Sequence, residues 1–557
     1  MKKRCKPASK DGFSKKENIE QGAILKHTKG LIKAALVYPN TYSAGMSSLG
    51  FQTVYRLLNQ MDRVTCERVF LPDQEKRPQE AVSIESALSL SQFDIIFFSI
   101  SFENDFIHLV QLLKEAGIPL RSPDRNHLHP LVVAGGVACF LNPEPIAPFM
   151  DIFLLGEAEC LIEPFFSIFE KSADRASLLH ALEQTIPGAY VPNLHTEKKP
   201  FRIQVQYLKS LAKISTFTSI LTSRTAFKDA FLIETLKGCP HGCRFCSAGF
   251  IYRPPRIYPA GNIMACMDSA SGKTDRIGLV SSAIADHPDI EEICTHGKRQ
   301  GFKLSFSSLR ADKLSEGLIQ VLSSSGVKTA TIAPEAGSER MRAVINKKIK
   351  EGDILFAAKK LVEAGIINIK LYFMIGLPFE EDADAHAIVD LTKKIKLEFL
   401  NASKKKHKIG TLTLSINQFI PKPFTPFQWS PMEKESVLKK RADIIKEGLK
   451  KIPNVKINVE SLRKAKIHAL LSLGDQKAAD ILEDALIKGW PAAIKGKKEY
   501  YDAVVYREKA LEAPLPWDFL DNRVRKEFLA KEFIKAGKEK ISASCPMIDC
   551  TVCRTCI

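Results

Sequence analysis

The chain has 557 residues, of which 45% are hydrophobic and 26% are charged. This length exceeds what one hydrophobic core supports and suggests roughly three or four domains, and the balanced composition excludes fibrous and intrinsically disordered proteins. No apolar run approaches the roughly 18 residues that span a bilayer, and no signal-peptide core follows the lysine-rich start. We therefore expect a cytoplasmic protein without a membrane span.

The formal net charge is +18, which favours an anionic partner such as RNA, an acidic protein or a membrane surface. Much of the excess lies in two runs, one at the N-terminus and one over residues 393–408. The first run contains Lys2, Lys3, Arg4, Lys6 and Lys10. Neither run is interleaved with the aromatic side chains on which single-stranded nucleic acids stack, so solvated tails and loop edges are favoured over a dedicated nucleic-acid patch.

Residues 1–30 are polar and basic without a sustained period, which predicts a poorly ordered lead-in. From residue 31 to about residue 190, short apolar strands alternate with amphipathic helices, which predicts a doubly wound parallel sheet. The expected strands cover 31–39, 94–100, 131–136 and 151–156, and an expected helix covers 104–117. Gly135, Gly136 and Gly156 lie at strand ends, where such sheets bind ligands and where glycine also permits a tight turn.

A linker over residues 191–225 leads to a second β/α series over residues 226–430. Its six expected strands cover 230–236, 276–282, 303–307, 328–333, 367–374 and 411–417. Helical segments separate these strands, including 314–324 and 353–364, so we expect parallel strands with right-handed crossovers. Six such units predict an open partial (β/α)6 barrel whose active face lies at the carboxyl ends of the strands.

Beyond the proline-rich segment 421–431 the strand signal disappears, and residues 431–540 are predicted to be mainly helical. Leu438, Ala442, Ile445 and Leu449 recur at helical spacing. Gly474 and Asp475 separate two further helical patterns, and residues 541–557 form a cysteine-rich end. The expected fold class is therefore α/β, with a doubly wound sheet, a partial barrel and a helical C-terminal region.

Thirteen cysteines in a chain without an export signal favour metal or redox use over a disulfide framework. Six are scattered singly and are expected to be buried or incidental: Cys5, Cys66, Cys139, Cys160, Cys266 and Cys294. The other seven fall into two tight groups, residues 239–246 and residues 545–556. These two groups are the candidate metal sites.

The first group is C-x3-C-x2-C, directly after the first barrel strand, and consists of Cys239, Cys243 and Cys246. Gly238 and Gly242 let the loop fold sharply, so that three sulfurs can point into one volume. Three cysteines suit an iron–sulfur cluster with an open iron better than structural zinc, which closes its shell with four ligands. His241 remains an alternative fourth ligand within the same loop.

This motif, with Phe245 before its last cysteine and a six-strand β/α series behind it, resembles the radical S-adenosylmethionine superfamily. The resemblance implies that Cys239, Cys243 and Cys246 are the catalytic cluster ligands. It also implies that the fourth iron of a 4Fe-4S cluster chelates S-adenosylmethionine, whose reductive cleavage gives methionine and a 5′-deoxyadenosyl radical. A small reductant protein such as flavodoxin or ferredoxin is then an expected partner.

The same resemblance implies cofactor-binding residues at the strand ends. They are Phe245, Ser305, Ser307 and Arg310, with Glu335 at the ribose, Lys347 at the methionine carboxylate and Gly376 beside the adenine. A charge-assisted pair at Lys347 makes physical sense. The chain departs from the family after the second strand, where Ser281, Ser282 and Ala283 replace the usual Gly-Gly-Glu that holds the amino group. Backbone carbonyls there, or Asp286, are the alternatives.

The N-terminal sheet resembles the cobalamin-binding domains that precede many of these barrels, through VVAGG at 132–136, NPEP at 142–145 and GEAE at 156–159. It lacks the D-x-H-x-x-G motif whose histidine ligates cobalt in many such domains. Cobalamin bound without a protein ligand and no cobalamin at all are both open, because a doubly wound sheet hosts many ligands.

The second cysteine group, C-x4-C-x2-C-x2-C, is a complete four-thiolate set made of Cys545, Cys550, Cys553 and Cys556. It predicts an auxiliary 4Fe-4S cluster or zinc, with the tight spacing favouring a cluster. With 421–429, 474–475 and 516–532 it resembles a family of functionally uncharacterised bacterial radical S-adenosylmethionine proteins. If this group binds a second cluster near the barrel mouth, the tail must fold back across the strand ends, and the segment around Phe528 and Phe533 would dock it. The alternative is a peripheral zinc or cluster site that only stabilises the tail.

The sequence thus predicts a radical S-adenosylmethionine enzyme of unknown substrate, with methyl transfer through cobalamin, sulfur insertion, and rearrangement or oxidation all open. The alternative is a non-catalytic RNA-binding or scaffold protein with structural metal sites, suggested by the +18 charge. RNA or a ribosomal component is also open as a substrate of the enzyme.

Overall fold

The structure is a computed structural model that describes residues 20–27, 29–72, 80–172, 174–195, 200–307, 309–404, 409–547, 550–553 and 555. The lysine run at residues 2–10 and Cys5 and Cys556 lie outside these residues, as do residues 405–408 of the second basic run. Among the described residues, no helix is both long and apolar enough to cross a membrane.

The N-terminal domain is a six-stranded sheet in the order β2-β1-β3-β4-β5-β6. The strands are β1 (Ile32–Thr41), β2 (Val64–Leu71), β3 (Ile95–Ser99), β4 (Leu131–Gly135), β5 (Ile152–Leu154) and β6 (Ala189–Tyr190). All neighbours are parallel except β5 and β6. The helices are α1 (Tyr42–Met46), α2 (Leu49–Gln60), α3 (Phe106–Glu115), α4 (Val137–Leu141), α5 (Ala158–Phe169) and α6 (Arg175–Thr185). The predicted doubly wound class is confirmed, with β2 as a strand that the apolar-run pattern missed.

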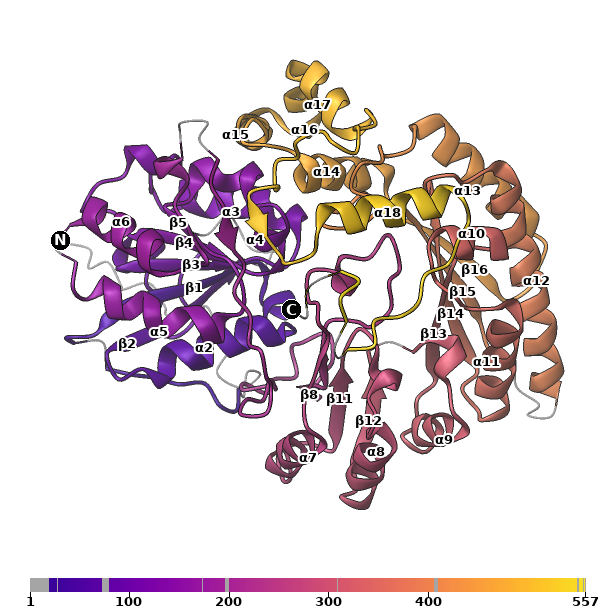
Figure 1. The fold of residues 1–557 in the computed structure, drawn as a ribbon. Helices are drawn as coiled ribbons and strands as arrows, with labels where there is room; N and C mark the ends of the chain where they lie inside the picture. The colour runs from indigo at the N-terminus through magenta and orange to yellow at the C-terminus, as the bar shows by residue number, and fades with distance from the viewer. Residues whose placement is uncertain are drawn as a thin grey trace, which may run out of the picture.

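The central region forms the partial barrel beside this domain (Figure 1). Its strands are β8 (Phe231–Glu234), β11 (Arg276–Val280), β12 (Lys303–Phe306), β13 (Thr329–Glu335), β14 (Asn368–Ile375), β15 (Leu412–Gln418) and β16 (Val455–Val459). They form two parallel sheets, β12-β11-β8 and β13-β14-β15-β16. The helices are α7 (Ala260–Ser269), α8 (Ile290–Arg299), α9 (Glu316–Ser324), α10 (Glu339–Val344), α11 (Glu351–Glu363), α12 (Asp382–Lys404) and α13 (Glu435–Leu449).

Strand β16 corrects the expectation that no strand follows residue 431. Its sequence VKINV alternates between half-buried and exposed positions at the sheet edge, so it lacks the apolar run that marked the other strands. It pairs in parallel with β15, and α13 provides the crossover. The barrel therefore has one strand more than the six that were expected.

The remaining C-terminal elements are helical, apart from the short β17 (Leu520–Asp521), which pairs with β7 (Ile203–Gln204). The helices are α14 (Leu462–Leu473), α15 (Ala478–Lys488), α16 (Trp490–Gly496), α17 (Lys498–Val505) and α18 (Lys526–Gly537). The buried Asn142 amide donates to the carbonyls of Ser472 and Gly474, which fixes the turn between α14 and α15 against the N-terminal domain. Helix α18 crosses between that domain and the barrel (Figure 1).

Residues 20 and 21, in the expected lead-in, are bound to the fold, which corrects the prediction of poor order for these two residues. Glu20 accepts hydrogen bonds from the buried Arg68 guanidinium at 3.0 and 2.6 Å. Gln21 pairs in an isolated bridge with Leu221. These contacts could not be predicted from the sequence, because their partners lie in β2 and in the linker, far along the chain.

Candidate functional site

The first cysteine group occupies a loop that begins just beyond β8 and the short β9 (Leu236–Lys237). Gly238 has φ +85°, and a Cβ there would lie 2.8 Å from Tyr252, so the loop turns where only glycine fits. Cys243 is buried, and Cys239 and Cys246 are half-buried. The loop opens at the carboxyl end of the barrel strands, where barrels of this type carry their chemistry.

The three thiols lie close enough together to affect one another's ionisation. Burial raises the pKa of Cys239 to about 12, and Cys243 and Cys246 add to that effect, while Arg310 opposes it. Burial likewise raises the pKa of Cys246 to about 11, with Lys347 opposing. A metal centre would stabilise the thiolate forms that burial disfavours. The surroundings thus combine a half-buried thiol cluster with two cations.

His241, the alternative fourth ligand, has other contacts in this structure. Its Nε2 lies 2.8 Å from a carboxylate oxygen of Asp286, and its Nδ1 lies 3.5 Å from the hydroxyl of Ser544. Burial raises the pKa of Asp286, but the hydrogen bond to His241 and the nearby cations lower it by more. The net pKa is therefore below its ordinary value. His241 therefore joins the cysteine loop to the segment after β11.

The serines predicted from the strand ends lie after β11, on β12 and directly after β12. The Ser307 hydroxyl donates to the Ser281 carbonyl at 2.8 Å and accepts from the Ser281 amide at 3.0 Å. The Ser305 hydroxyl donates to the Ile277 carbonyl at 3.3 Å. Ser282 is exposed. These bonds fix the path of the backbone beside the cysteine loop, where the family's acidic residue is absent.

Glu335 and Lys347, predicted separately, form one ion pair with Nζ and Oε1 3.2 Å apart. Glu335 has φ +66°, a conformation that is costly for a residue with a side chain and that concentrates at functional sites. Burial lowers the pKa of Lys347, but Glu335 and the Cys243 thiol raise it, so the net pKa is above its ordinary value. The Arg310 guanidinium donates to the Lys347 carbonyl at 3.0 Å and pairs with Asp312.

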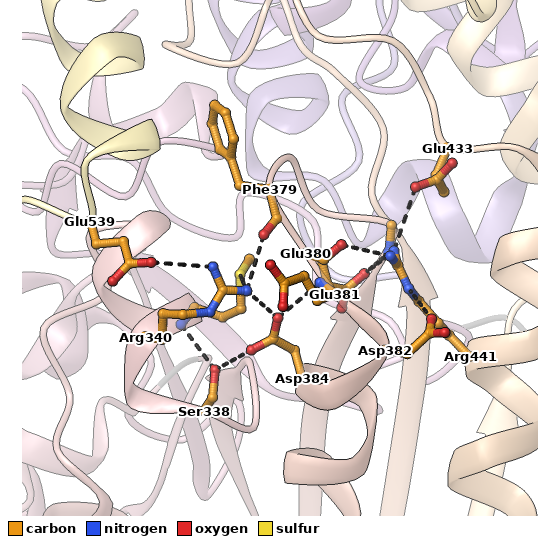
Figure 2. Close-up of polar contacts among 12 residues, drawn as sticks. Ser338, Arg340, Phe379, Glu380, Glu381, Asp382, Asp384, Glu433, Arg441 and Glu539 are labelled. Carbon is orange, nitrogen blue, oxygen red and sulfur yellow. Dashed lines mark hydrogen bonds and ion pairs between the residues drawn. The ribbon is translucent and has the colours of Figure 1, made fainter.

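Gly376 forms the turn at the end of β14, with φ +80°. Its amide donates to the Glu380 carboxylate at 2.5 Å, and Arg441 of α13 pairs with the same carboxylate at 2.7 Å (Figure 2). Burial raises the pKa of Glu380 to about 7, even with Arg441 beside it. The turn at Gly376 is thus held by a buried ion pair that the sequence did not indicate.

A second network ties α10 to the start of α12 and to the C-terminal tail. Arg340 pairs with Asp384 and donates to the Phe379 carbonyl at 3.0 Å, and it lies 3.4 Å from Glu539 (Figure 2). The Ser338 hydroxyl donates to Asp384 at 2.6 Å. The loop after β13, the turn after β14 and the tail therefore form one connected structure at the barrel mouth.

The tail beyond α18 folds back onto the cysteine loop, which is one of the two arrangements that the sequence left open. The Cys545 amide donates to the Pro240 carbonyl at 2.7 Å. Phe533 of α18 lies 5.7 Å from Phe379 and 6.3 Å from Phe427, ring centre to ring centre, at the barrel mouth. Phe528 contacts Phe250 at 6.5 Å. The docking helix and the tail thus close over the ends of β14 and β15.

Two buried polar residues hold this arrangement together and were missed by sequence reasoning. Arg244, between two of the cysteines, donates to Glu532 of α18 at 3.1 Å and to the Lys540 carbonyl at 2.6 Å. Asn346 donates to the Gly242 carbonyl at 2.9 Å and accepts from the Ser542 amide at 2.9 Å. Arg244 lies within the cysteine motif and Asn346 lies next to Lys347, and this was the one available signal, because their partners in α18 and the tail are about 200 to 300 residues away.

Among the residues that the structure describes, no three His, Cys, Asp or Glu side chains are grouped so as to hold a single metal ion. In the tail, Cys553 is 1% exposed, and Cys545 and Cys550 are half-buried. Cys556 lies outside the described residues. The described cysteines of both groups are thus not arranged around one ion.

A cavity of about 300 Å³ lies where the carboxyl edge of the N-terminal sheet faces the barrel. Gly135, Gly136 and Gly156 line it from the sheet, and Glu234, Lys237 and Tyr252 line it from the barrel. Most of its other lining residues are apolar, and the described lining contains no histidine. The predicted ligand edge of the sheet therefore faces a cavity shared with the barrel.

Two family models match the chain. The one described as "Radical SAM proteins, N-terminal" matches residues 50–192, and the one described as "Radical SAM superfamily" matches residues 233–392. The chain is also 31% identical over 458 residues to "Uncharacterized protein MJ0966" of Methanocaldococcus jannaschii, covering 82% of this chain and 91% of that protein. The chain therefore belongs to the radical S-adenosylmethionine superfamily.

The chain is also similar, at low identity, to solved structures of radical S-adenosylmethionine enzymes. The cobalamin-dependent S-adenosylmethionine radical enzyme OxsB is 14% identical with a TM-score of 0.49, over 84% of this chain and 67% of that one. The radical S-adenosylmethionine methyltransferase TsrM from Kitasatospora setae is 12% identical with a TM-score of 0.45, over 69% and 72%.

Membership of the family makes the chain an enzyme that uses a 4Fe-4S cluster and S-adenosylmethionine. The alternative of a non-catalytic RNA-binding or scaffold protein is therefore wrong. A reductant is a general requirement of this class.

Proposed function

We propose that the chain cleaves S-adenosylmethionine reductively at a 4Fe-4S cluster held by Cys239, Cys243 and Cys246. The observation that carries this proposal is the grouping of these three thiols on one loop at the barrel mouth, with Arg310 and Lys347 beside them. The cluster, when bound, supplies the electron that breaks the carbon–sulfur bond of the sulfonium. The chain's own residues bind and orient the cofactor and exclude water.

The Glu335–Lys347 pair is assigned to the polar ends of S-adenosylmethionine. Lys347 is the buried cation beside Cys243, so its ammonium suits the methionine carboxylate, and Glu335 suits the ribose hydroxyls. Arg310 supports Lys347 through its bond to the Lys347 carbonyl. In this assignment the cofactor replaces part of an ion pair that already exists, which keeps both side chains in place before binding.

The remaining predicted residues shape the amino and adenine ends of the site. Ser281 and Ser307, locked to each other, present the backbone beside the cysteine loop, with Ser282 and Ser305 alongside. Asp286, held ionised by His241, is the carboxylate available for the amino group. Phe245 and the Gly376 turn flank the adenine, and Phe245 packs on the small core that includes Leu377.

Electron paramagnetic resonance of the dithionite-reduced, anaerobically reconstituted protein tests the proposal. We expect a [4Fe-4S]⁺ signal whose g values change when S-adenosylmethionine is added. The triple Cys239→Ala, Cys243→Ala, Cys246→Ala variant should lose every S-adenosylmethionine-sensitive signal, whereas Cys294→Ala, a buried cysteine on α8, should keep it. A fully iron-loaded protein whose spectrum ignores S-adenosylmethionine would contradict the proposal.

We also propose that the cavity between the sheet and the barrel takes the nucleotide tail of a corrinoid. Its volume of about 300 Å³ suits an aromatic base with its sugar rather than a whole corrin, and its mainly apolar lining suits a planar ring. Since the described lining contains no histidine, cobalt would have no histidine ligand from this cavity. If a corrinoid is held there, methyl transfer is the reaction class that would use both cofactors.

Refolding with hydroxocobalamin under anaerobic conditions tests this second proposal. One equivalent of corrinoid should stay with the protein through gel filtration. Val54→Trp, which fills the cavity from α2, should abolish retention, whereas Lys114→Trp on the exposed side of α3 should leave it intact. Loss of the corrinoid from the wild-type protein would contradict corrinoid binding and would favour sulfur insertion or rearrangement as the reaction.

A further inference from the structure

Another cavity, of about 920 Å³, lies where α18 begins, at the end of that helix nearer to the N-terminal domain (Figure 1). The first turns of α18 and the chain between β17 and α18 line it, together with residues just before β7 and residues 424 and 428 after β15. None of its lining residues belongs to the cysteine loop or lines the cavity between the sheet and the barrel. Its size is that of a small-molecule site.

The lining of this cavity has an excess of positive charge. Asp518 pairs with Lys526 at 2.6 Å, and Asp521 pairs with Arg202 at 3.2 Å. The other charged lining residues form no ion pair with any described residue, and three of these four are cations: Arg523, Arg525, Lys531 and the single carboxylate Glu527. An anion in the cavity would balance this excess.

Arg523 lacks both acceptors and a paired carboxylate. The carbon at the centre of its guanidinium lies 3.3 Å from the centre of the Tyr207 ring. Its Nε and Nη1 are buried and have no hydrogen-bond partner within the described chain. Burial lowers the pKa of Arg523 and Arg256 adds to that effect, so the net pKa is below its ordinary value although Asp521 and Glu157 oppose the shift. A nearby anion would stabilise this cation.

Gln428 presents a buried donor to the same cavity. The residue is 2% exposed, and its Oε1 accepts from the Phe424 amide and from the Trp517 indole, both at 2.9 Å. Because both partners can only donate, the oxygen of the side-chain amide is identified by chemistry, and the other atom is the Nε2 donor. No described residue accepts from this Nε2, although Gln428 lines the cavity. Buried donors are normally paired, so this one indicates an acceptor on a ligand.

Helix α18 adds backbone donors. Its N-cap residue, Arg525, makes no side-chain cap hydrogen bond. The amides of Phe528 and Leu529 donate to the Arg525 carbonyl, whereas those of Lys526 and Glu527 have no acceptor in the described part of the chain. Free amides at the positive end of a helix dipole favour an anion.

From these groups we propose that the cavity binds a small organic phosphate. The phosphate lies at the start of α18, where the Gln428 Nε2, the free α18 amides and Arg523 supply donors and positive charge. A phosphate has more acceptor oxygens and more charge than a carboxylate, which matches a donor set of this size. The cavity is larger than a phosphate, and Phe201 and Phe424 offer rings against which an aromatic body packs. The site does not rest on the cleavage proposed above.

Equilibrium dialysis of the anaerobically reconstituted full chain tests the site, with phenyl phosphate as the probe. One equivalent should bind at millimolar concentration, with an affinity that falls as salt is raised, and inorganic phosphate should compete. Phenol should not bind, because it lacks the phosphate, and benzoate should bind at least tenfold more weakly. Absence of phenyl phosphate binding by the wild-type protein, or equal binding of benzoate, would overturn the proposal.

Gln428→Glu is the most specific variant. It keeps Oε1 and the bonds from Phe424 and Trp517, and it replaces the free Nε2 donor with a carboxylate oxygen that repels a phosphate. The Kd for phenyl phosphate should rise at least tenfold. Gln300→Glu, at the exposed end of α8, is the matched control and should bind as the wild-type protein does.

A second variant covers the case in which Gln428→Glu does not fold. Arg525→Glu, Lys531→Glu reverses two exposed charges and should also weaken binding at least tenfold, whereas Lys298→Glu, Arg299→Glu on α8 should not. Wild-type affinity in the first pair would overturn the site. An RNA oligonucleotide that binds far more tightly than phenyl phosphate, and loses affinity in the same variants, would overturn the small-molecule assignment in favour of RNA.

The cluster variant separates this site from the proposed cleavage. The Cys239→Ala, Cys243→Ala, Cys246→Ala protein should bind phenyl phosphate with wild-type affinity, and loss of binding there would contradict an independent site. Failure of cleavage with intact phosphate binding would reject the proposed function alone, and cleavage without phosphate binding would reject this site alone.

Discussion

Replacement of Arg244 should loosen the tail from the cysteine loop. The Arg244 side chain is fully buried and donates to three carbonyls, of Ala343 at 3.0 Å, Val344 at 2.8 Å and Lys540 at 2.6 Å, as well as to the buried Glu532. Breaking a buried ion pair by removing one partner costs about 3–5 kcal/mol. Glu532 keeps Lys535 and Ser542, so we expect about 3 kcal/mol for Arg244→Leu.

Hydrogen exchange followed by mass spectrometry measures this loss where it occurs. The amides of Ser542 and Cys545 are bonded to Asn346 and Pro240, so they exchange when the tail opens. A loss of about 3 kcal/mol should speed their exchange by roughly 100-fold. Peptides from α3, in the N-terminal domain, should be unchanged and serve as the internal control.

The double variant Arg244→Leu, Glu532→Leu separates the ion pair from simple loss of packing. Removing both charges leaves no buried charge unpaired, so the double variant should lose less than the sum of the single losses. Unaltered protection of the tail in Arg244→Leu, or strictly additive losses in the cycle, would refute the reasoning.

Three further variants test other parts of the molecule. Burial raises the pKa of Glu144 to about 7, although Glu144 accepts a hydrogen bond from Tyr190, so the folded state keeps this proton to a higher pH than the unfolded state does. The free energy of unfolding of the wild-type protein, measured with urea, should therefore fall by about 2–3 kcal/mol between pH 4.5 and 7.5, and Glu144→Gln should remove this pH dependence. A Cβ on Gly249 would lie 2.5 Å from the His241 carbonyl, so Gly249→Ala should lower iron occupancy of the reconstituted protein, and full occupancy would count against a rigid loop. Phe533→Ala removes the half-buried ring that docks α18, at about 2 kcal/mol, and should expose residues 540–547 to proteolysis; a protease-resistant tail would show that α18 docks without it.

The features predicted well from the sequence are those that depend on neighbours along the chain. The cysteine loop is one short segment with its own glycines, and strands β1, β3, β4, β5, β8 and β11 to β15 are local apolar runs. The fold-back of the tail was one of two arrangements that the sequence left open, beside a peripheral position of the four thiols. Strand β16 was not predicted because its half-buried and exposed positions alternate over only five residues, too few to distinguish an edge strand from a loop.

The features that were missed depend on partners distant in sequence. Glu380 and Arg441 form a buried pair across 61 residues, and Arg244 and Glu532 do so across 288. A charged residue is predicted from sequence to be exposed, because most charged side chains are solvated. Only the fold shows which of them are buried against each other. The pairing of Glu335 with Lys347 was likewise not foreseen, although both residues were singled out.

Formation of 5′-deoxyadenosine tests the central claim most directly. The reconstituted protein should convert S-adenosylmethionine to 5′-deoxyadenosine and methionine in equal amounts when dithionite is added under anaerobic conditions. The variant without Cys239, Cys243 and Cys246 should form neither product above background. Absence of 5′-deoxyadenosine from fully iron-loaded wild-type protein, or its formation at wild-type rate by the triple variant, would contradict the account.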